Sequence, residues 1–346
     1  MLPIGTVHES VRKRSVIAQL HRTRHEVARK ASVYAGCAAM RLAPGEVPVF
    51  STQSIVEGMA EDGAKSITKG AAEGTAICTK SRVTAMMNDL ASSGAEPVGV
   101  MATVLLPEKC EEQNLRKMIR RLEEQLDVFR VQIMDVRTEV VRAAEKPVIT
   151  LCGVGKARQN LLISPGGARP GDDIVLTKWA GLEGTMILAQ EREQELGTRY
   201  PSDLIRTARE FGQYLSNARE AAVGIRMHAS AMHNAREGGI FGALWELAES
   251  AGVGLHADLH KIPIRQETVE ISEFFGINPY ELRAEGCMIL TTADGKALLA
   301  ELSKENIPAV IAGKITEGRD RVLEIGGELR YLVPPKSDEL NRVIPL

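Results

Sequence analysis

Paired cysteines, net charge and long apolar runs are all scarce in this sequence. The five cysteines form no Cys-x-x-Cys pair, so their spacing predicts neither a zinc knuckle nor a disulfide framework. The 43 basic and 45 acidic residues nearly cancel, which excludes a global field that would attract nucleic acid or an anionic membrane. No apolar run reaches the roughly 18 residues of a membrane-spanning helix, and no sustained apolar run after Met1 indicates a signal peptide. We therefore expect a globular protein of the reducing cytoplasm.

Basic residues are concentrated in one place, between residues 8 and 30. Val16, Ile17 and Leu20 give this segment a narrow apolar stripe, which predicts a basic N-terminal amphipathic helix within residues 1–30. Contact with an anionic partner is one interpretation, and a solvated helix face packed by its stripe is the other. No aromatic residue is interleaved for base stacking, which favours the second. The basic residues are Arg12, Lys13, Arg14, Arg22, Arg24, Arg29 and Lys30.

The rest of the chain is long enough for two domains, and predicted strands alternate with predicted helices. This alternation indicates α/β (α+β) architecture. We place the boundary near residue 145, between a domain of residues 31–145 and a domain of residues 146–335, followed by a tail of residues 336–346.

Apolar periodicity and turn residues predict the individual elements. In the first domain we expect two strands within 31–58 joined by a turn at 43–46, a mobile loop at 62–80, a helix at 111–126 and a strand at 128–134. In the second we expect strands at 147–154, 172–177, 253–258, 287–292 and 309–315, a hairpin at 322–332, and helices at 181–190, 202–215 (with Ser202 as its cap), 239–250, 268–275 and 295–304.

Residues 84–107 combine the end of a helix, a turn at Gly94 and a near-continuous apolar strand, which is typical of a strand covered on both faces. Asn88 and Asp89 lie close to the helix end. A carboxylate there is suited to a hard cation, which prefers oxygen ligands. An Asn–Asp pair is also a common way to stabilise a helix end, so a purely structural role stays open.

The segment Met87-Asn-Asp-Leu-Ala-Ser-Ser-Gly-Ala-Glu-Pro97 resembles the Val-Asn-Asp-Leu-Ala-x-x-Gly-Ala-x-Pro signature of the aminoimidazole ribonucleotide (AIR) synthetase superfamily. That superfamily includes hydrogenase-maturation carbamoyl dehydratases, selenophosphate synthetases and thiamin-monophosphate kinases. Four more segments resemble it in the family's order, at residues 171–184, 232–240, 276–286 and 311–317. The whole sequence most resembles the hydrogenase-maturation (HypE-like) branch.

This resemblance implies a two-domain PurM-like fold, with a strand-rich N-terminal domain that pairs with its copy in a homodimer. It also implies ATP in a cleft between the domains, with Mg²⁺ held against the phosphates by carboxylates. Most of these carboxylates are missing, because Cys37, Gln53 and Asn234 stand at acidic positions of the family. Asp89 is kept and is the metal ligand we expect.

Arg137 stands at a further polar position of the family, although a shift of one residue in this match would restore Asp135 or Glu139 as a ligand. The expected nucleotide-binding residues are Asn88, Asp89, Arg137, Thr138, Asn234, Gly238 and Gly239.

Two functions fit this pattern. In the first, ATP, another nucleotide or a related phosphate ester still binds, with Arg137 and the backbone amides around Gly238 and Gly239 replacing part of the magnesium charge, and an oxygen or amide group is activated. In the second, the site is degenerate and the chain is a binding or regulatory partner in a maturation or biosynthetic complex. The second substrate and the catalytic residues are not identified by the sequence.

Three further residues invite a chemical role that we do not assign. We expect Cys37 to be a buried structural thiol, because free cysteine is among the most buried residue types. His256 and His260 fall on a predicted strand, where their spacing does not bring both rings to one metal ion. Residues 342–346 lack the terminal cysteine that accepts a carbamoyl group in hydrogenase-maturation members, so that chemistry is not expected.

Overall fold

In the computed structural model the chain forms two compact units. The structure describes residues 1–34, 36–56 and 70–344, with side chains from residue 79 onward in the helix that begins at Gly70. Unit 1 comprises Met1–Leu90 and Ala95–Asn160, and unit 2 comprises Ala91–Gly94 and Leu161–Leu346. The predicted boundary near residue 145 is therefore displaced. The strand that follows it, β7 (Val148–Arg158), pairs with two strands of unit 1 and completes its sheet.

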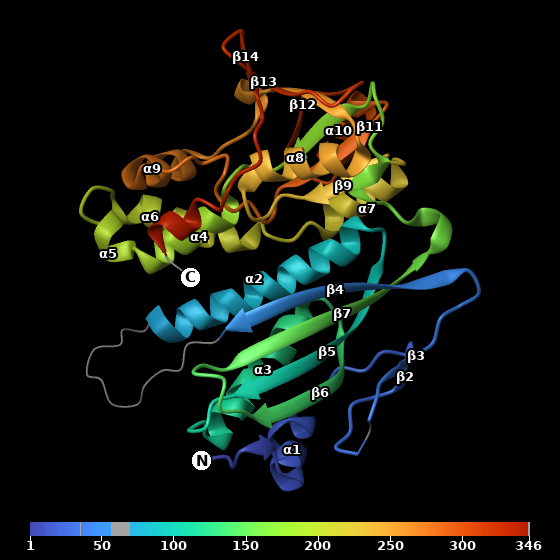
Figure 1. Ribbon diagram of the computed structural model, residues 1–346, viewed down its shortest axis with the longest axis vertical. Helices are drawn as coiled ribbons and strands as arrows, with labels where there is room; N and C mark the ends of the chain where they lie inside the picture. Colours follow the sequence, from blue (N-terminus) through green and yellow to red (C-terminus); the bar gives the residue numbers. More distant parts are fainter. Residues whose placement is uncertain (35, 57–69, 345–346) are drawn as a thin grey trace. The chain divides into compact units, whose positions relative to one another are not determined.

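Unit 1 is built on a five-stranded sheet in the order β1-β6-β5-β7-β4 (Figure 1). Strands β5 and β6 are parallel, whereas β7 is antiparallel to both β4 and β5. Helices α2 and α3 pack their apolar side chains against one face of this sheet. The elements are β1 (Gly5–Thr6), α1 (Glu9–Ser15), β4 (Glu46–Val56), α2 (Gly70–Ser92), β5 (Glu96–Leu106), α3 (Glu112–Val128), β6 (Gln132–Val140) and β7, with β2 (Val27–Arg29) and β3 (Ala39–Met40) in a separate two-stranded sheet.

Helix α3 confirms the helix expected at residues 111–126. Five of its apolar side chains recur every three or four residues and are buried, which places one helical face on the sheet, whereas Val128 at its end is exposed. The helix continues to Val128, so the strand expected at 128–134 begins later, at Gln132. The buried apolar residues of α3 are Leu115, Met118, Ile119, Leu122 and Leu126.

The N-terminal segment is helical over a shorter range than predicted. Helix α1 ends at Ser15, and the chain continues through a short 3₁₀ turn to β2. The physical reason lies in α3, where the Glu123 carboxylate accepts the backbone N–H groups of His21 (2.7 Å) and Arg22 (2.9 Å) and so draws the chain out of a helix. Arg14 pairs with Glu112 at 2.5 Å, so the basic cluster is met by acidic groups of the same unit.

Of the two predictions for residues 31–80, the turn between strands is confirmed and the loop needs correction. The turn at 43–46 is confirmed, because the N–H of Glu46 donates to the carbonyl of Ala43 at 3.0 Å. The strands on either side of it do not pair with each other, since β3 pairs with β2 and β4 pairs with β7. Residues 70–80 belong to α2 rather than to a loop, and the loop expected from 62 to 69 lies outside the described residues.

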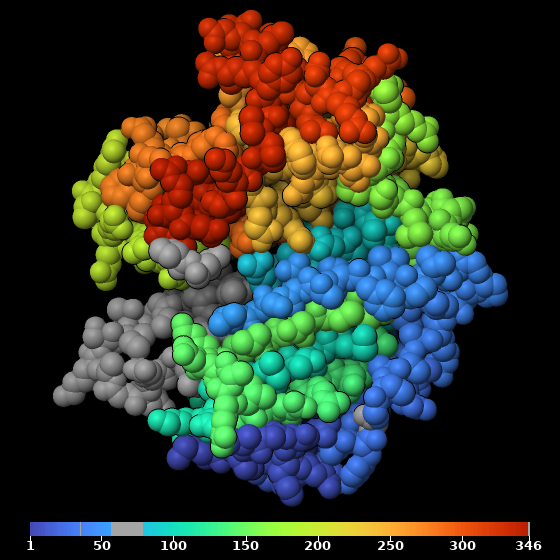
Figure 2. Space-filling model, viewed as in Figure 1, coloured from blue at the N-terminus to red at the C-terminus, as the bar shows by residue number. Residues whose placement is uncertain are grey.

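Strand β5 is covered on one face only. Val100, Ala102 and Val104 are buried against the helices, whereas Thr103, which points to the other side, is exposed. The expectation of cover on both faces is wrong for the single chain. We call this uncovered side the open face; Figure 2 shows strands β4, β7 and β5 at the surface of the molecule.

Unit 2 contains a seven-stranded sheet in the order β14-β13-β10-β12-β8-β11-β9 (Figure 1). Its strands are β8 (Asp173–Thr177), β9 (Ala231–Asn234), β10 (Gly254–Asp258), β11 (Met288–Thr292), β12 (Ala309–Thr316), β13 (Arg321–Ile325) and β14 (Glu328–Tyr331). Its helices are α4 (Leu182–Glu191), α5 (Glu193–Leu196), α6 (Ser202–Arg209), α7 (Ala218–Arg226), α8 (Gly239–Ala251), α9 (Gln266–Phe275), α10 (Gly295–Lys304) and α11 (Leu340–Val343).

Successive residues of β8 enter two different cores, which shows that the sheet of unit 2 is covered on both sides. Ile174 and Leu176 join the core with α8, whereas Val175 joins the core with α7 and α10. A third apolar cluster links α4, α6 and α9 to Leu340 near the C-terminus. None of the described helices combines the length and hydropathy that a bilayer crossing requires.

Most elements predicted for the second domain are confirmed within one or two residues. The strand expected at 147–154 is an exception, because β7 continues to Arg158. The helix expected at 202–215 ends at Arg209 and continues as a 3₁₀ turn, and its cap position is held by Pro201 rather than by Ser202. Helix α7 has no predicted counterpart. Its Gly224 lowers helix propensity, but a Cβ there would lie 2.7 Å from Leu290, so glycine allows close packing on the sheet.

Candidate functional site

Asp89 lies one residue after the fully buried Asn88 in α2, and its own side chain is half-buried. Its carboxylate accepts a hydrogen bond from the hydroxyl of Ser51 on β4 at 2.9 Å. The helix presents these two polar residues from a run that is otherwise almost entirely buried and apolar. Asp89 therefore has the defined position and partial exposure that a ligand-binding carboxylate needs.

Arg137 lies on a different side of the same unit. It pairs in register with Thr103 on the open face, whereas Asp89 contacts Ser51 on the helix-covered face. Its side chain is exposed and forms an ion pair with Glu139 at 3.0 Å. The thickness of the sheet separates Arg137 from Asp89, so these two predicted site residues do not share one pocket of unit 1.

Thr138 follows Arg137 in β6 and so points to the opposite, helix-covered face. It is buried, and its carbonyl accepts the N–H of Val7 at 3.2 Å. Within this unit Thr138 packs in the interior beside the strand that enters from the N-terminus.

Asn234 ends β9 in unit 2 and is almost fully buried. Its Nδ2 donates to the hydroxyl of Ser92 at 3.2 Å, and its Oδ1 accepts from Nδ2 of Asn217 at 3.1 Å. These two bonds fix which way the amide points, so a ligand that meets Asn234 meets a side chain already oriented by its neighbours.

Gly238 and Gly239 form the turn that starts α8. Both have left-handed backbone angles, and a Cβ on Gly239 would lie 2.4 Å from the carbonyl oxygen of Tyr280, so this turn needs glycine. The N–H of Gly238 donates to Oδ2 of Asp338 at 2.8 Å, and that of Gly239 donates to a backbone carbonyl. A phosphate at this turn would have to displace the Asp338 carboxylate, which weakens the prediction that these two amides bind phosphate.

Metal ligands are sparse among the residues that the structure describes. In that part of the chain, no group of three or more His, Cys, Asp or Glu side chains is arranged to hold a metal ion. Among the described residues, the motif position keeps one carboxylate, that of Asp89. This fits Mg²⁺ where phosphate oxygens and water complete the octahedral coordination, as in many nucleotide sites.

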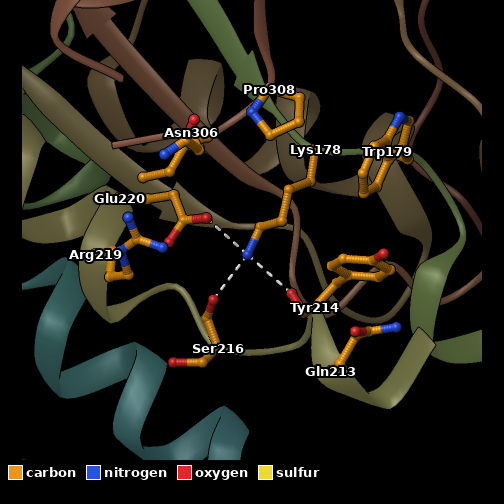
Figure 3. Close-up of a pocket in the computed structure, with 10 residues that line it drawn as sticks. Lys178, Trp179, Gln213, Tyr214, Ser216, Arg219, Glu220, Asn306 and Pro308 are labelled. Carbon is orange, nitrogen blue, oxygen red and sulfur yellow. Dashed lines mark hydrogen bonds and ion pairs between the residues drawn. The ribbon is translucent and has the colours of Figure 1, made fainter. Parts of the chain in front are cut away.

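A cavity of about 390 Å³ lies at the end of β8 in unit 2 (Figure 3). Its walls come from residues 178–179 after β8, residues 213–220 around the start of α7, and residues 306–308 before β12. Trp179 and Tyr214 meet edge to face, with 5.2 Å between ring centroids. Lys178 and Glu220 lie at the buried base, where their charged atoms are 2.7 Å apart.

Burial and charge act in opposite directions on this pair. Burial lowers the pKa of Lys178, and the neighbouring Glu220 carboxylate opposes that change. Burial also raises the pKa of the nearby Cys287 thiol to about 12, so Cys287 is uncharged at neutral pH. Sequence reasoning did not single out Lys178. The available signal was a lysine directly after a short strand with an apolar centre, Ile174-Val-Leu176, which places a charge at the edge of a core.

Cys37 is exposed, and its sulfur accepts a hydrogen bond from Arg29 at 3.2 Å. The prediction of a buried structural thiol is therefore wrong, because Cys37 lies between β2 and β3, beside the exposed Gly36 and shortly before β3 begins. His256 on β10 forms a contact of 3.2 Å with Glu324 on the neighbouring strand β13.

The two units carry the two domains of a known family. The N-terminal domain of the AIR synthase related proteins matches residues 34–157, and the C-terminal domain matches residues 169–326. The chain therefore belongs to the AIR synthase related protein family, and the PurM-like α/β fold predicted from its motifs is confirmed. The end of the first match at residue 157 agrees with the inclusion of β7 in unit 1.

Within this family the chain is similar to hydrogenase-maturation proteins. The carbamoyl dehydratase HypE of Rhodobacter capsulatus is 30% identical over 289 residues, which are 83% of this chain and 79% of that protein. The crystal structure of E. coli HypE superposes with a TM-score of 0.74 at 20% identity, over 97% of this chain and 100% of that one. A crystal structure of HypE in complex with ATP has a TM-score of 0.65 at 20% identity, over 89% and 90% of the two chains.

Proposed function

We propose that the protein binds ATP or a related nucleotide and uses it to activate an oxygen or amide group. The observation that carries this proposal is the match to both domains of the family, which extends to a solved HypE in complex with ATP. Asp89, at the acidic position that the family motif keeps, is the residue to which we assign the metal-bound phosphates. A single protein carboxylate should hold Mg²⁺ more weakly than the several carboxylates of other members.

Asn88 and Asn234 are the other polar residues that we assign to the nucleotide. Asn234 has an amide where the family has an acid, so it offers hydrogen bonds rather than a metal ligand. Arg137 lies on the open face of its own unit, on the other side of the sheet from Asp89. We therefore assign Arg137 a contact with the phosphates only if it comes from a second copy of the chain.

A degenerate, regulatory relative is the second candidate. Two observations favour it: the amide of Gly238 is already bonded to Asp338, and the described residues include no cluster of metal ligands. A protein of this kind would act in a maturation or biosynthetic complex without turning over ATP.

Thermal melting with ATP, with and without Mg²⁺, distinguishes the two candidates. A nucleotide at about one hundred times its dissociation constant stabilises the folded state by about 2.7 kcal/mol. We expect such a shift for the wild type and expect Asp89→Ala to abolish the part that depends on Mg²⁺. Asp203→Ala, at an exposed aspartate of α6, is the control and should leave the shift unchanged. No shift with any nucleotide would support the degenerate relative.

We also propose that the open face of unit 1 pairs with a second copy of the chain. Phe50 and Val56 on this face have 59% and 58% of their surface exposed, and the apolar residues of β5 continue the same surface. Exposed apolar surface of this kind marks an interaction site, and the resemblance to the family implies a homodimer through this domain.

A further inference from the structure

The side chain of Lys178 is held by a complete set of acceptors. Its ammonium nitrogen donates to the carbonyl oxygens of Tyr214 (2.8 Å) and Ser216 (2.7 Å) and pairs with Glu220 at 2.7 Å (Figure 3). An ammonium group has three hydrogens, and these three oxygens match them. Lys178 is therefore held as a cation, which makes it unsuited to act as a nucleophile.

All three oxygens belong to one short stretch of chain, residues 214–220, which enters α7. Two peptide carbonyls and a carboxylate that converge within hydrogen-bond distance form a cradle for one positive charge. Without that charge, the buried Glu220 would have no cation at 2.7 Å to offset its own desolvation. The ammonium of Lys178 thus acts as a built-in cation that holds this stretch in place.

The same stretch carries Asn217, which is fully buried. Its Nδ2 donates to Oδ1 of Asn234 at 3.1 Å and also lies 3.5 Å from the carbonyl of Cys287. Asn234 in turn donates to Ser92. A continuous path of hydrogen bonds and backbone therefore runs from Lys178 through residues 214–217 to the amide of Asn234.

We propose that Lys178 is a positioning residue, whose ammonium holds residues 214–220 so that Asn217 orients the amide of Asn234 for its ligand. This inference rests on the proposed nucleotide site, because it takes Asn234 as a residue of that site. The backbone supports it: Lys178 has a left-handed φ of 56°, uncommon outside glycine, and its N–H is tied to the carbonyl of Pro308 at 2.8 Å. Both features fix the direction in which the side chain leaves β8.

The cavity beside Lys178 provides a specific experiment. Lys178→Ala removes the last three carbons and the amine of the side chain, which together correspond to propylamine, and the cavity gives a small solute access to the vacated space. We expect this variant to lose about tenfold or more in ATP affinity, and we expect n-propylammonium to restore most of the loss. Lys304→Ala, at an exposed lysine, is the matched control and should show neither effect.

A second measurement does not depend on nucleotide. The side-chain amide signal of Asn234 in an NMR spectrum, assigned by its disappearance in Asn234→Asp, should shift in Lys178→Ala and return with n-propylammonium. Lys178→Met keeps most of the aliphatic stem and removes the ammonium group with its charge and its three donors, and it serves the same purpose if the alanine variant does not fold. Asn217→Ala should shift the same signal and should lower ATP affinity non-additively with the change at Lys178.

The outcomes separate the two hypotheses. If the wild type binds no nucleotide, the proposed function fails, while the amide signal still tests the positioning role. If the signal of Asn234 is the same in the folded Lys178 variants as in the wild type, the positioning role is overturned. Additive effects of Lys178→Ala and Asn217→Ala on ATP affinity would overturn it as well.

Discussion

The two sheets of this protein use similar apolar sequences in different ways. In unit 2, neighbouring residues of β8 enter separate cores on the two faces of the sheet. In unit 1, β5 is equally apolar, yet only one face is covered by helices, and Thr103 on the other face is exposed. An apolar run in a sequence therefore predicts that a strand is suited to burial on both faces. It does not show whether helices of the same chain cover both faces.

The largest expected effect comes from matched leucine truncations in the two sheets. Leu290→Ala in β11 removes a fully buried side chain and should lower the free energy of unfolding by about 2–5 kcal/mol. Leu105→Ala on the open face of β5 should lower it by less than half as much, when measured by urea unfolding of a dilute monomer. Equal losses at both sites would mean that the open face is covered within one chain.

A charge introduced on the open face tests whether a second copy of the chain covers this face. Phe50→Glu should convert a dimer into a monomer, because a carboxylate would be desolvated against the apolar partner face. The measurement is the molar mass by light scattering, with circular dichroism to show that the fold is kept. Val128→Glu, at an exposed apolar residue outside this face, is the control. A dimer that survives Phe50→Glu would place the interface elsewhere.

A smaller expected effect is a difference in how low pH changes the stability of two segments, one around Glu26 in unit 1 and one around Asp338 in unit 2. The hydrogen bond from Arg24 lowers the pKa of Glu26 to about 2, so the stability that Glu26 contributes is complete above its ordinary pKa and is lost as the pH falls toward 2. Burial raises the pKa of Asp338, so its contribution changes in the opposite direction and grows as the pH falls through the raised value.

Hydrogen exchange at neutral pH and at a pH of about 3 measures this contrast. On acidification, residues 21–29 of unit 1 should lose protection before residues 338–341 of unit 2. Glu26→Gln should remove most of the pH dependence of the first segment and lower stability at neutral pH by about 1–3 kcal/mol. Simultaneous loss of protection in both segments would contradict the assigned pKa directions.

The sequence predicted elements well where one face of a helix or strand faces a core within the same unit. Helix α10 (Gly295–Lys304) has the predicted bounds, and the five apolar residues of α3 are the ones buried. The boundary near residue 145 was displaced because β7 pairs with strands that are distant in sequence, and local periodicity contains no information on such pairing. Helix α7 was missed because Gly224, which permits close packing, is a poor helix former.

The candidate site was predictable in part for the same reason. Motifs identified Asp89, Asn234 and the Gly238–Gly239 turn as residues of interest, but they could not show that Asp338 occupies the amide of Gly238. Lys178 escaped notice because its three acceptors come from the backbone and from Glu220, more than thirty positions away along the chain. Every residue has a backbone carbonyl, so the residue types in a sequence do not show which carbonyls accept a hydrogen bond from a lysine.

Crystals grown with a non-hydrolysable ATP analogue and Mg²⁺ test the central claim most directly. The account predicts a bound nucleotide whose metal ion is held by phosphate oxygens, water and a single protein carboxylate, that of Asp89, with the amide of Asn234 within hydrogen-bond distance of the nucleotide. A metal ion coordinated by three or more aspartate or glutamate oxygens, or crystals that bind no nucleotide at all, would contradict it.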